Sequence, residues 1–492
     1  MSDKPYEIII GLEVHVQLQT NSKLFCRCST RFGASPNTQT CPVCTGMPGS
    51  LPVMNRKAFA LSLKTAVALN CEIPEFTKWD RKQYYYPDLP KGYQISQFDL
   101  PLSQNGWLEI SDSKGAFEPK KVGITRAHLE EDAGKSMHDE ATGKADSRID
   151  LNRTGTPLLE IVSEPDMRSP QEARAYLTEL KLLLTYLGVS DCNMQEGSLR
   201  VDANINLHLE TDDGKIATPI VEVKNMNSFR AVERALVYEA ERHYEIWQET
   251  KIKLGDKGGH KTTRGWDDAN QRTYVQREKE ESSDYRYFPD PDLVPVIVKA
   301  DEVETVRGNL GELPAALRDR MQHEYKIDAY DADVIVNQGR ALVDYYIELA
   351  ETSGNPKRAS NWIQQDVMRT LNEEEIGIDE FAISAKSLAE LLKAIDNGEV
   401  DNTRGKDVFA EMLSSGKSAA KSMKQLGIEK IDSSALSDLC QELLDANPKI
   451  VADVKSGNQK AVGALIGQAK KKNPNVNPND IRNLCLELIE GM

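Results

Sequence analysis

Hydrophobic and polar residues alternate in three short segments of the chain, residues 10–18, 199–209 and 220–224. Side chains of a β-strand point alternately to its two sides, so each segment predicts a strand with one apolar and one polar face. A fourth segment, residues 157–162, is apolar except for Glu160. Strands of this kind predict a mostly antiparallel sheet with one buried face and one wet face.

Two longer segments show helical spacing instead. SPQE at residues 169–172 is a capping box with proline at the first helical position, and leucines recur behind it until Gly188. Ser228 is the expected N-cap of a second helix, residues 229–248. We expect both helices to pack on the sheet.

The pattern changes near PDPDLVP at residues 289–295, a proline-dense segment typical of a domain boundary, and the chain beyond it is mostly helical. A weaker boundary falls at residues 426–432. We therefore predict an α+β protein with three domains. These are a cradle of mostly antiparallel sheet with packed helices (1–295), an all-helical domain (296–428) and a small helical tail (429–492).

Composition narrows the class of protein. The 492 residues include 61 basic and 77 acidic ones, a net charge of −16, which argues against a protein coated in nucleic acid but leaves room for a local basic groove. No apolar run approaches the length of a membrane-spanning helix, and MSDKPYEIII at the N-terminus lacks the features of a secretory signal. We therefore expect a cytoplasmic protein without a membrane partner, in a compartment where disulfides are rare.

Four of the eight cysteines are clustered in an insert at residues 26–44. Cys26 and Cys28 are followed by Cys41 and Cys44 in a CPVC knuckle. Four thiolates on two short loops suit tetrahedral Zn²⁺, and a site without a ligand position for water is structural. Two unrelated pairs of free thiols are the alternative.

The polar faces of the predicted strands carry an unusual set of side chains. Glu13, His15, Asp202 and Glu222 occupy these faces, where an ordinary wet sheet would carry threonine, serine and lysine. Such residues are typical of hard-metal and phosphate chemistry. This interpretation requires the strands to be neighbours, which alternation cannot show. The alternative is a solvated sheet face.

Two loops add candidate binding groups. Residues 81–96 combine Arg81, Lys82 and Lys91 with tyrosines and prolines, a composition that could hold a nucleotide or an RNA end. Residues 125–134 place three acids beside His128. Solvated surface loops are the alternative for both. The sequence contains no Walker A loop and no GxGxxG, GxSxG or HExxH motif, so any nucleotide is bound by other means.

Several of these segments, in order along the chain, resemble the GatB/GatE family, the B subunits of tRNA-dependent aspartyl/glutamyl amidotransferases. The resemblance rests on GLEVHVQL (11–18), YYYPDLPKGYQISQ (84–97), TRAHLEEDAGK (125–135), DLNRTGTPLLEIVSEPD (150–166), GSLRVDANI (197–205), EVKNMNSF (222–229) and DYRYFPDPDL (284–293). It extends into the helical remainder through Asn361-Trp362 and residues 447–468.

The resemblance implies a ligase. ATP would phosphorylate the side-chain carboxylate of misacylated Glu-tRNA(Gln), Asp-tRNA(Asn) or both, and ammonia would then displace the phosphate. An amidase, the A subunit, would supply the ammonia, and a small C subunit would complete a heterotrimer. The implied cofactors are ATP, Mg²⁺ and a structural Zn²⁺.

The resemblance also assigns roles to residues. The metal and catalytic centre would comprise Glu13, His15, Glu131, Glu160, Asp202 and Glu222. Lys82 would contact phosphate, together with Arg81 and Lys91 of the same loop. The tail, with six lysines and one acid between Pro448 and Asn473, would bind the tRNA body.

Two other classes stay open on the residues alone. One is a zinc-stabilised RNA-binding scaffold without chemistry of its own, and the other is a metal-dependent hydrolase of nucleic acid.

Overall fold

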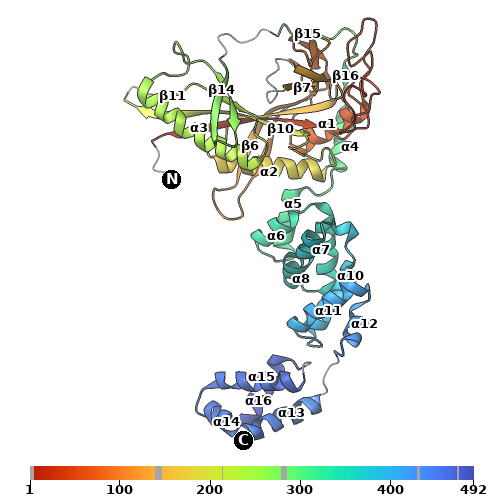
Figure 1. The fold of residues 1–492 in the computed structure, drawn as a ribbon, viewed down its shortest axis with the longest axis vertical. Helices are drawn as coiled ribbons and strands as arrows, with labels where there is room; N and C mark the ends of the chain where they lie inside the picture. The colour runs from red at the N-terminus through yellow and green to blue at the C-terminus, as the bar shows by residue number, and fades with distance from the viewer. Residues whose placement is uncertain are drawn as a thin grey trace. The chain divides into compact units, whose positions relative to one another are not determined.

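The computed structural model describes residues 5–138, 147–212, 214–278, 285–428, 433–473 and 476–491. The chain divides into two compact units, Met1–Ala316 and Leu317–Met492. In the described part, all strands belong to the first unit and the second is helical, which confirms the predicted α+β class (Figure 1). The boundaries at residues 295 and 428 stay predictions, and residues 429–432, at the second boundary, lie outside the described residues.

The strands of the first unit lie between residues 7 and 297. They are β1 (Glu7–Gln17), β2 (Phe76–Thr77), β3 (Asp80–Gln83), β4 (Tyr93–Ser96), β5 (Ser103–Ile110), β6 (Lys120–Glu131), β7 (Lys135–His138), β8 (Ser147–Asp150), β9 (Pro157–Ser163), β10 (Leu199–Thr211), β11 (Gly214–Ala217), β12 (Val221–Lys224), β13 (Thr262–Asp267), β14 (Arg272–Glu278), β15 (Phe288–Pro289) and β16 (Val296–Ile297).

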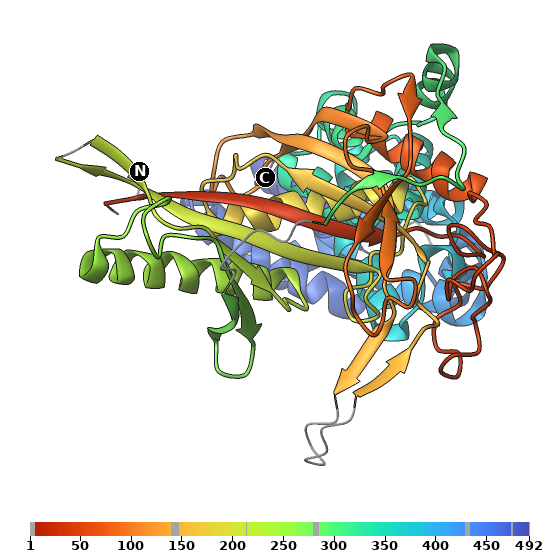
Figure 2. The ribbon, with the colours of Figure 1, turned by 90° about the horizontal axis from the view of Figure 1, so that it is seen from above.

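One large sheet organises this unit. Among the described residues it has nine strands in the order β14-β13-β12-β10-β1-β9-β6-β5, with β11 beside β10. All its pairs are antiparallel except β12 with β13. The long strands β1 and β10 lie side by side at its centre (Figure 2). The four predicted strands therefore exist as β12, β10, β1 and β9, and they are consecutive neighbours in the sheet.

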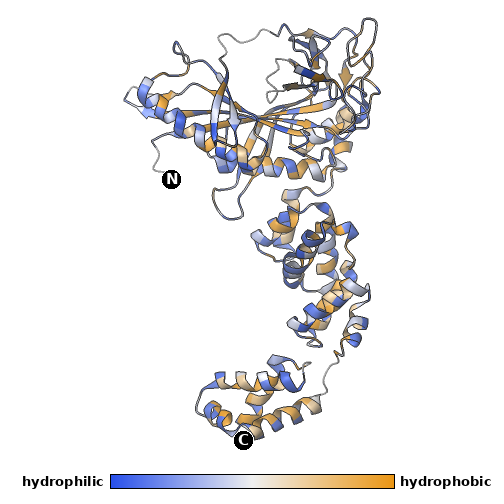
Figure 3. Cartoon of the chain, viewed as in Figure 1, coloured by the Kyte–Doolittle hydropathy of each residue, from blue (hydrophilic) through white to orange (hydrophobic). Residues whose placement is uncertain are grey.

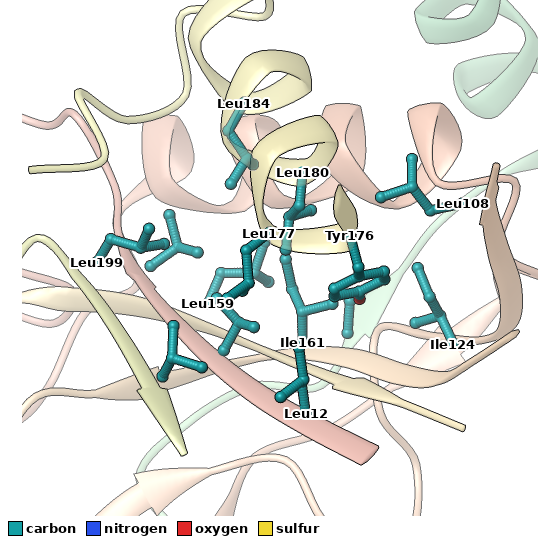
Figure 4. Close-up of a cluster of buried hydrophobic side chains, with 14 of the residues drawn as sticks. Leu12, Leu108, Ile124, Leu159, Ile161, Tyr176, Leu177, Leu180, Leu184 and Leu199 are labelled. Atoms are coloured by element: carbon teal, nitrogen blue, oxygen red, sulfur yellow. The ribbon is translucent and has the colours of Figure 1, made fainter. Parts of the chain in front are cut away.

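Helix α2 (Pro170–Tyr186) covers the apolar face of the sheet. Ser169 caps it by accepting a hydrogen bond from the backbone N–H of Glu172, and Gly188 follows it in a left-handed conformation with φ +63°. Its leucines and Tyr176 pack against Leu12, Leu159 and Ile161 of the central strands (Figure 4). Burying these side chains stabilises the sheet and leaves the opposite face polar.

Helix α3 (Phe229–Thr250), capped by Ser228, packs beside α2 and along β10. A charged network ties it to the β13–β14 hairpin. The fully buried Glu239 pairs with Arg242 at 2.7 Å and with Arg264 of β13 at 3.3 Å. Burial raises the pKa of Glu239, but hydrogen bonds from His243 and Arg242 outweigh it and lower the pKa to about 2.

The Glu239→Gln substitution is therefore expected to destabilise the chain at pH 7. Because the folded-state pKa lies below the ordinary value of 4.5, the stabilisation is present above pH 4.5 and is lost as the pH falls toward 2. The expected loss at pH 7 is on the order of 3 kcal/mol. Urea unfolding at a series of pH values checks this, and equal stability of the two proteins at pH 7 would contradict it.

The remaining helices are α1 (Arg56–Ala68) and α4 (Ala300–Gly308) in the first unit, and α5 (Pro314–His323) at the division. The second unit contains α6 (Ala329–Val336), α7 (Arg340–Ser353), α8 (Pro356–Trp362), the π-helical η2 (Ile363–Val367), α9 (Met368–Glu374), η3 (Ile378–Glu380), α10 (Ala385–Asp396), α11 (Asn402–Ser415), α12 (Ala419–Gln425), α13 (Ser433–Ala446), α14 (Pro448–Lys455), η4 (Gln459–Ala461), α15 (Val462–Lys472) and α16 (Pro478–Glu490).

The helices of the second unit are amphipathic, with hydrophilic and hydrophobic residues alternating along each ribbon (Figure 3). The four helices α13–α16 enclose an apolar cluster that includes Leu443, Leu465 and Ile481. None of the helices within the described residues is long and apolar enough to cross a membrane.

Candidate active site and metal centre

The acidic residues of the predicted strands lie on one polar face of the central sheet. Glu13 of β1 is opposite Asp202 of β10, and His15 is opposite Glu160 of β9. Glu222 of β12 lies one strand beyond β10. The requirement that these strands be neighbours is therefore met.

A cavity of about 580 Å³, here called the cradle cavity, opens on this face. Its volume is within the range of small-molecule sites. It is lined by Glu13, Lys82, Ser96, Gln97, Phe98, Arg126, His128, Glu130, Glu160, Glu222, Lys224, Thr263, Gln276, Tyr285 and Tyr287.

His15 lies among three carboxylates beside this cavity. Its Nε2 atom is 3.5 Å from Glu13, 3.8 Å from Glu130 and 3.5 Å from Glu160. Burial alone would lower the pKa of His15, but its hydrogen bond to Glu160 and the nearby negative charges raise the pKa to about 9. The three carboxylates thus favour a positive charge at this point, and the protonated His15 ring provides it.

The carboxylates themselves differ in their tendency to ionise. Burial and the neighbouring charge of Glu160 raise the pKa of Glu13. Burial would also raise the pKa of Glu160, but the charge of His128 and the hydrogen bond and charge of His15 lower it below its usual range. The Glu160 carboxyl group is therefore strongly ionised, whereas that of Glu13 is more basic.

Two overlapping groups could hold a cation. One ligand atom each from Glu13, His15 and Asp202 lies within 4.8 Å of the others, and so do those from His15, Glu130 and Glu160. Hard divalent cations prefer oxygen ligands, which the four carboxylates of these groups supply.

Basic side chains face the same cavity. Burial would lower the pKa of Lys82, but the Glu130 carboxylate, Tyr287 and Glu160 raise it, so Lys82 stays a cation. Arg126 lies 3.6 Å from Glu160. Lys224 forms ion pairs with Asp202 and, at 3.6 Å, with Glu222. Cations and carboxylates are thus interleaved in one concave site.

The structure places Glu131 outside the cavity. Its carboxylate pairs with Lys91 and accepts a hydrogen bond from the Ile95 backbone N–H at 3.1 Å. The adjacent Glu130 lines the cavity instead, because alternate residues of β6 point to opposite sides. The same alternation places Arg126 and His128 in the cavity.

Alternation also separates the basic residues of the 81–96 loop, part of which is strand β3. Lys82 lines the cavity, whereas Arg81 points away and binds Asp290 at 2.7 Å and Asp292 at 3.0 Å. Lys91 is occupied by Glu131. Of the three predicted phosphate contacts, Lys82 alone is placed in the cradle cavity.

Part of the cavity wall comes from segments that sequence patterns did not single out as site residues. Thr263 of β13 donates a hydrogen bond to Glu222 at 3.0 Å, and Lys261 lies 3.5 Å from the same carboxylate. Tyr285 and Tyr287 precede β15. Both tyrosines lie in residues 284–293, one of the segments that resemble the GatB/GatE family. This resemblance was the one feature of the sequence that could have indicated them as site residues.

The four clustered cysteines converge in the insert. One Sγ atom from each of Cys26, Cys28, Cys41 and Cys44 lies within 4.8 Å of the others, so the cluster could bind a metal ion. The hydrogen bond from Cys26, with smaller contributions from the Cys41 N–H and Lys23, lowers the pKa of Cys44 to about 4. A thiolate is the form that ligates metal.

Lys23 completes the surroundings of this cluster. It is fully buried, and its ammonium lies 3.6 Å from Cys44 Sγ and donates to the Gln39 carbonyl at 2.8 Å. A buried ammonium without a carboxylate partner is costly unless an anion is close. Its position fits a negatively charged thiolate cluster.

Comparisons with known proteins agree with this geometry. Residues 8–304 match the model of the GatB/GatE catalytic domain, and residues 344–489 match that of the GatB domain. The chain belongs to the GatB/GatE family. The family expectation from the sequence is thereby confirmed, and the cradle cavity lies wholly within the catalytic-domain match.

Relatives with closely similar lengths support the same assignment. The chain is 61% identical over 488 residues to the aspartyl/glutamyl-tRNA(Asn/Gln) amidotransferase B subunit of Rhodopirellula baltica, covering 99% of this chain and 98% of the relative. It is 47% identical to the protein of the same name from Carboxydothermus hydrogenoformans, covering 95% of each chain. The Brevibacillus brevis protein of that name is 44% identical, with 99% of each covered.

Proposed function

We propose that this chain is the B subunit of a glutamine-dependent amidotransferase. It converts Glu-tRNA(Gln), Asp-tRNA(Asn) or both to the amidated tRNAs. The observation that carries the proposal is the cradle cavity, where carboxylates and cations of the catalytic-domain match face one another. The near full-length identity to proteins of that name supports it.

The chemistry requires activation of a poor electrophile. An oxygen of the aminoacyl side-chain carboxylate attacks the γ-phosphorus of ATP, and ADP leaves. The nitrogen of ammonia then attacks the resulting acyl phosphate, and inorganic phosphate and a proton leave as the amide forms. Phosphoryl transfer depends mainly on positioning and charge neutralisation, and the carboxylates and cations that line this cavity would provide both.

Basic residues of the cavity would bind the substrate oxygens. Lys82 is a cation on the cavity wall. Among the described residues, Arg126 Nε and His128 Nδ1 are buried without a hydrogen-bond partner. Buried polar groups are normally satisfied, so these two nitrogen atoms are suited to donate a hydrogen bond to an oxygen of a phosphate or carboxylate that enters the cavity.

The carboxylates would hold Mg²⁺. Glu13 and Asp202 supply oxygen atoms in one of the two groups that could hold a cation, and Glu130 and Glu160 supply them in the other, with His15 common to both. A bound Mg²⁺ would neutralise charge on the transferring phosphate. His15 and Glu222 would orient this set, through the contacts of His15 with Glu13 and Glu160 and of Glu222 with Lys224.

The cysteine insert would hold a structural Zn²⁺, since four thiolates leave no position for water. Lys23 would offset part of the negative charge of that centre.

The Lys23→Met substitution is therefore expected to lower zinc affinity roughly 10- to 100-fold. Competition with a chromogenic chelator measures this, with Lys64→Met as the control because Lys64 binds the Leu187 carbonyl instead. Unchanged zinc affinity in Lys23→Met would refute the role of Lys23.

Partners follow from the chemistry of the site and the family. An amidase, the A subunit, would release ammonia from glutamine, and a small C subunit would complete a cytoplasmic heterotrimer. The lysine-rich tail between Pro448 and Asn473 would bind the tRNA body.

One assay tests the proposed function. The chain is combined with its A and C partners, misacylated tRNA, ATP, Mg²⁺ and glutamine, and amide formation on the tRNA is followed. We expect amide that depends on this chain and on ATP. A shortened tRNA would indicate a hydrolase, and intact, unamidated tRNA would indicate an RNA-binding scaffold. Either result would overturn the proposal.

A further inference from the structure

An aromatic stack forms part of the cavity wall, and the proposed chemistry does not use it. The ring of Phe98 lies parallel to that of Tyr287, with centroids 4.0 Å apart and planes within 7°. Phe98 nevertheless stays 53% exposed. Because Tyr287 covers one face of the phenyl ring, the opposite face is open to a further flat group.

Both rings are held to the strand that carries Lys82. The backbone N–H of Phe98 donates to Asp80 of β3 at 3.1 Å. Tyr287 directly precedes β15, which pairs with β3 through Phe288 and Arg81. The stack is therefore fixed relative to the cation that lines the same cavity.

Tyr285 connects the stack to that cation. The Lys82 ammonium lies 4.9 Å from the centroid of the Tyr285 ring, and this ring meets Tyr287 edge-on at 6.1 Å. A ligand with a flat group on Phe98 and an anionic group at Lys82 would match this arrangement of aromatic surface and positive charge.

The substrates of the proposed reaction differ in whether they have such a flat group. An aspartyl or glutamyl side chain, ammonia and phosphate have no π-face. ATP and the 3′-terminal adenosine that bears the amino acid each have an adenine. Stacking on aromatic side chains is a common way to bind a base without reading its edge.

We propose that Phe98, supported by Tyr287, is the platform on which an adenine base stacks in the cradle cavity. The base belongs either to ATP or to the terminal adenosine of the tRNA. The inference rests on the proposed function and adds a binding role for two residues outside the predicted metal and phosphate contacts.

The test uses the reconstituted complex with Phe98→Ala, Phe98→Leu and Phe98→Trp. KM for ATP and for misacylated tRNA, and kcat, are measured for each. Losing the ring face in Phe98→Ala is expected to raise one of the two KM values roughly 5- to 100-fold while kcat changes little. Phe98→Leu, which keeps an apolar side chain without a π-face, should resemble Phe98→Ala, and Phe98→Trp should resemble the wild type. Phe32→Ala is the matched control, because Phe32 is 69% exposed and is not among the residues lining this cavity.

The outcomes separate the two sources of the base. A higher KM for ATP alone assigns the platform to ATP, and a higher KM for tRNA alone assigns it to the terminal adenosine. Unchanged KM values, or Phe98→Leu with wild-type constants, would overturn the platform. A wild-type complex without ATP-dependent amide formation would instead overturn the proposed function.

Discussion

Replacing Glu13 with glutamine is expected to lower kcat for amide formation roughly 10²- to 10³-fold, because removing one preorganised charge from a phosphoryl-transfer site has effects of this size. Glu13 lies opposite Asp202 in the sheet and 3.5 Å from His15, and these three residues form one of the two groups that could hold a cation. The glutamine side chain has nearly the same volume, so the sheet is preserved. Amide formation and glutamine hydrolysis are measured in the same complex.

The control for this substitution lies on the same strand. Glu7 belongs to the same alternation of β1, but it is exposed and binds Arg168 and Lys215. Glu7→Gln should keep kcat within about twofold of wild type. Glutamine hydrolysis by the amidase partner should persist in both variants. Full amide formation by Glu13→Gln would show that the carboxylate face is not the reaction centre.

Replacing Cys41 and Cys44 together with serine is expected to release zinc and destabilise the first unit. The insert lies against the core, where Phe25 packs edge-on against Trp79 with centroids 5.1 Å apart. Without the metal the two cysteine loops of the insert are no longer linked to each other, and Leu24 and Phe25 become more exposed to solvent. A loss of about 3 kcal/mol lowers Tm by roughly 6–12 °C. Zinc content and thermal unfolding are the measurements.

A buried cysteine outside the cluster provides the comparison. Cys71 is buried in the core, and Cys71→Ala should retain about one zinc ion per chain. If the double variant kept both its metal and its Tm, the insert would not be a zinc centre. Wild-type chain purified without zinc under reducing, chelator-free conditions would count equally against it.

Local sequence patterns were sufficient to predict four strands and two helices of the cradle, but not the pairing of those strands. Alternation shows that Glu13 and His15 share a strand face, and capping residues located α2 and α3. The neighbours of β1 are strands much later in the chain, and nothing in a strand's own residues identifies its partner. The prediction of a joint metal face therefore depended on a pairing that only the folded chain shows.

The differences between the predicted and the observed site residues arise from the alternation of side chains along strands that the sequence did not predict. Because side chains alternate along β6, Glu130 lies on the same side as His128, whereas Glu131 points to the other side and pairs with Lys91. Interpreted as a loop, this segment gives no basis for separating the two glutamates. The same rule separates Lys82 from Arg81. The β13–β14 hairpin, with Thr263, has too weak an apolar alternation to predict a strand.

Trapping the activated carboxylate tests the central claim most directly. The reconstituted complex is incubated with misacylated tRNA, ATP and Mg²⁺, with hydroxylamine in place of glutamine. An acyl phosphate reacts with hydroxylamine to give a stable hydroxamate on the tRNA, accompanied by ADP. The account predicts ATP-dependent hydroxamate with the wild-type chain and almost none with Glu13→Gln. Equal hydroxamate from both, or none from a wild-type complex that makes amide with glutamine, would contradict activation in the cradle cavity.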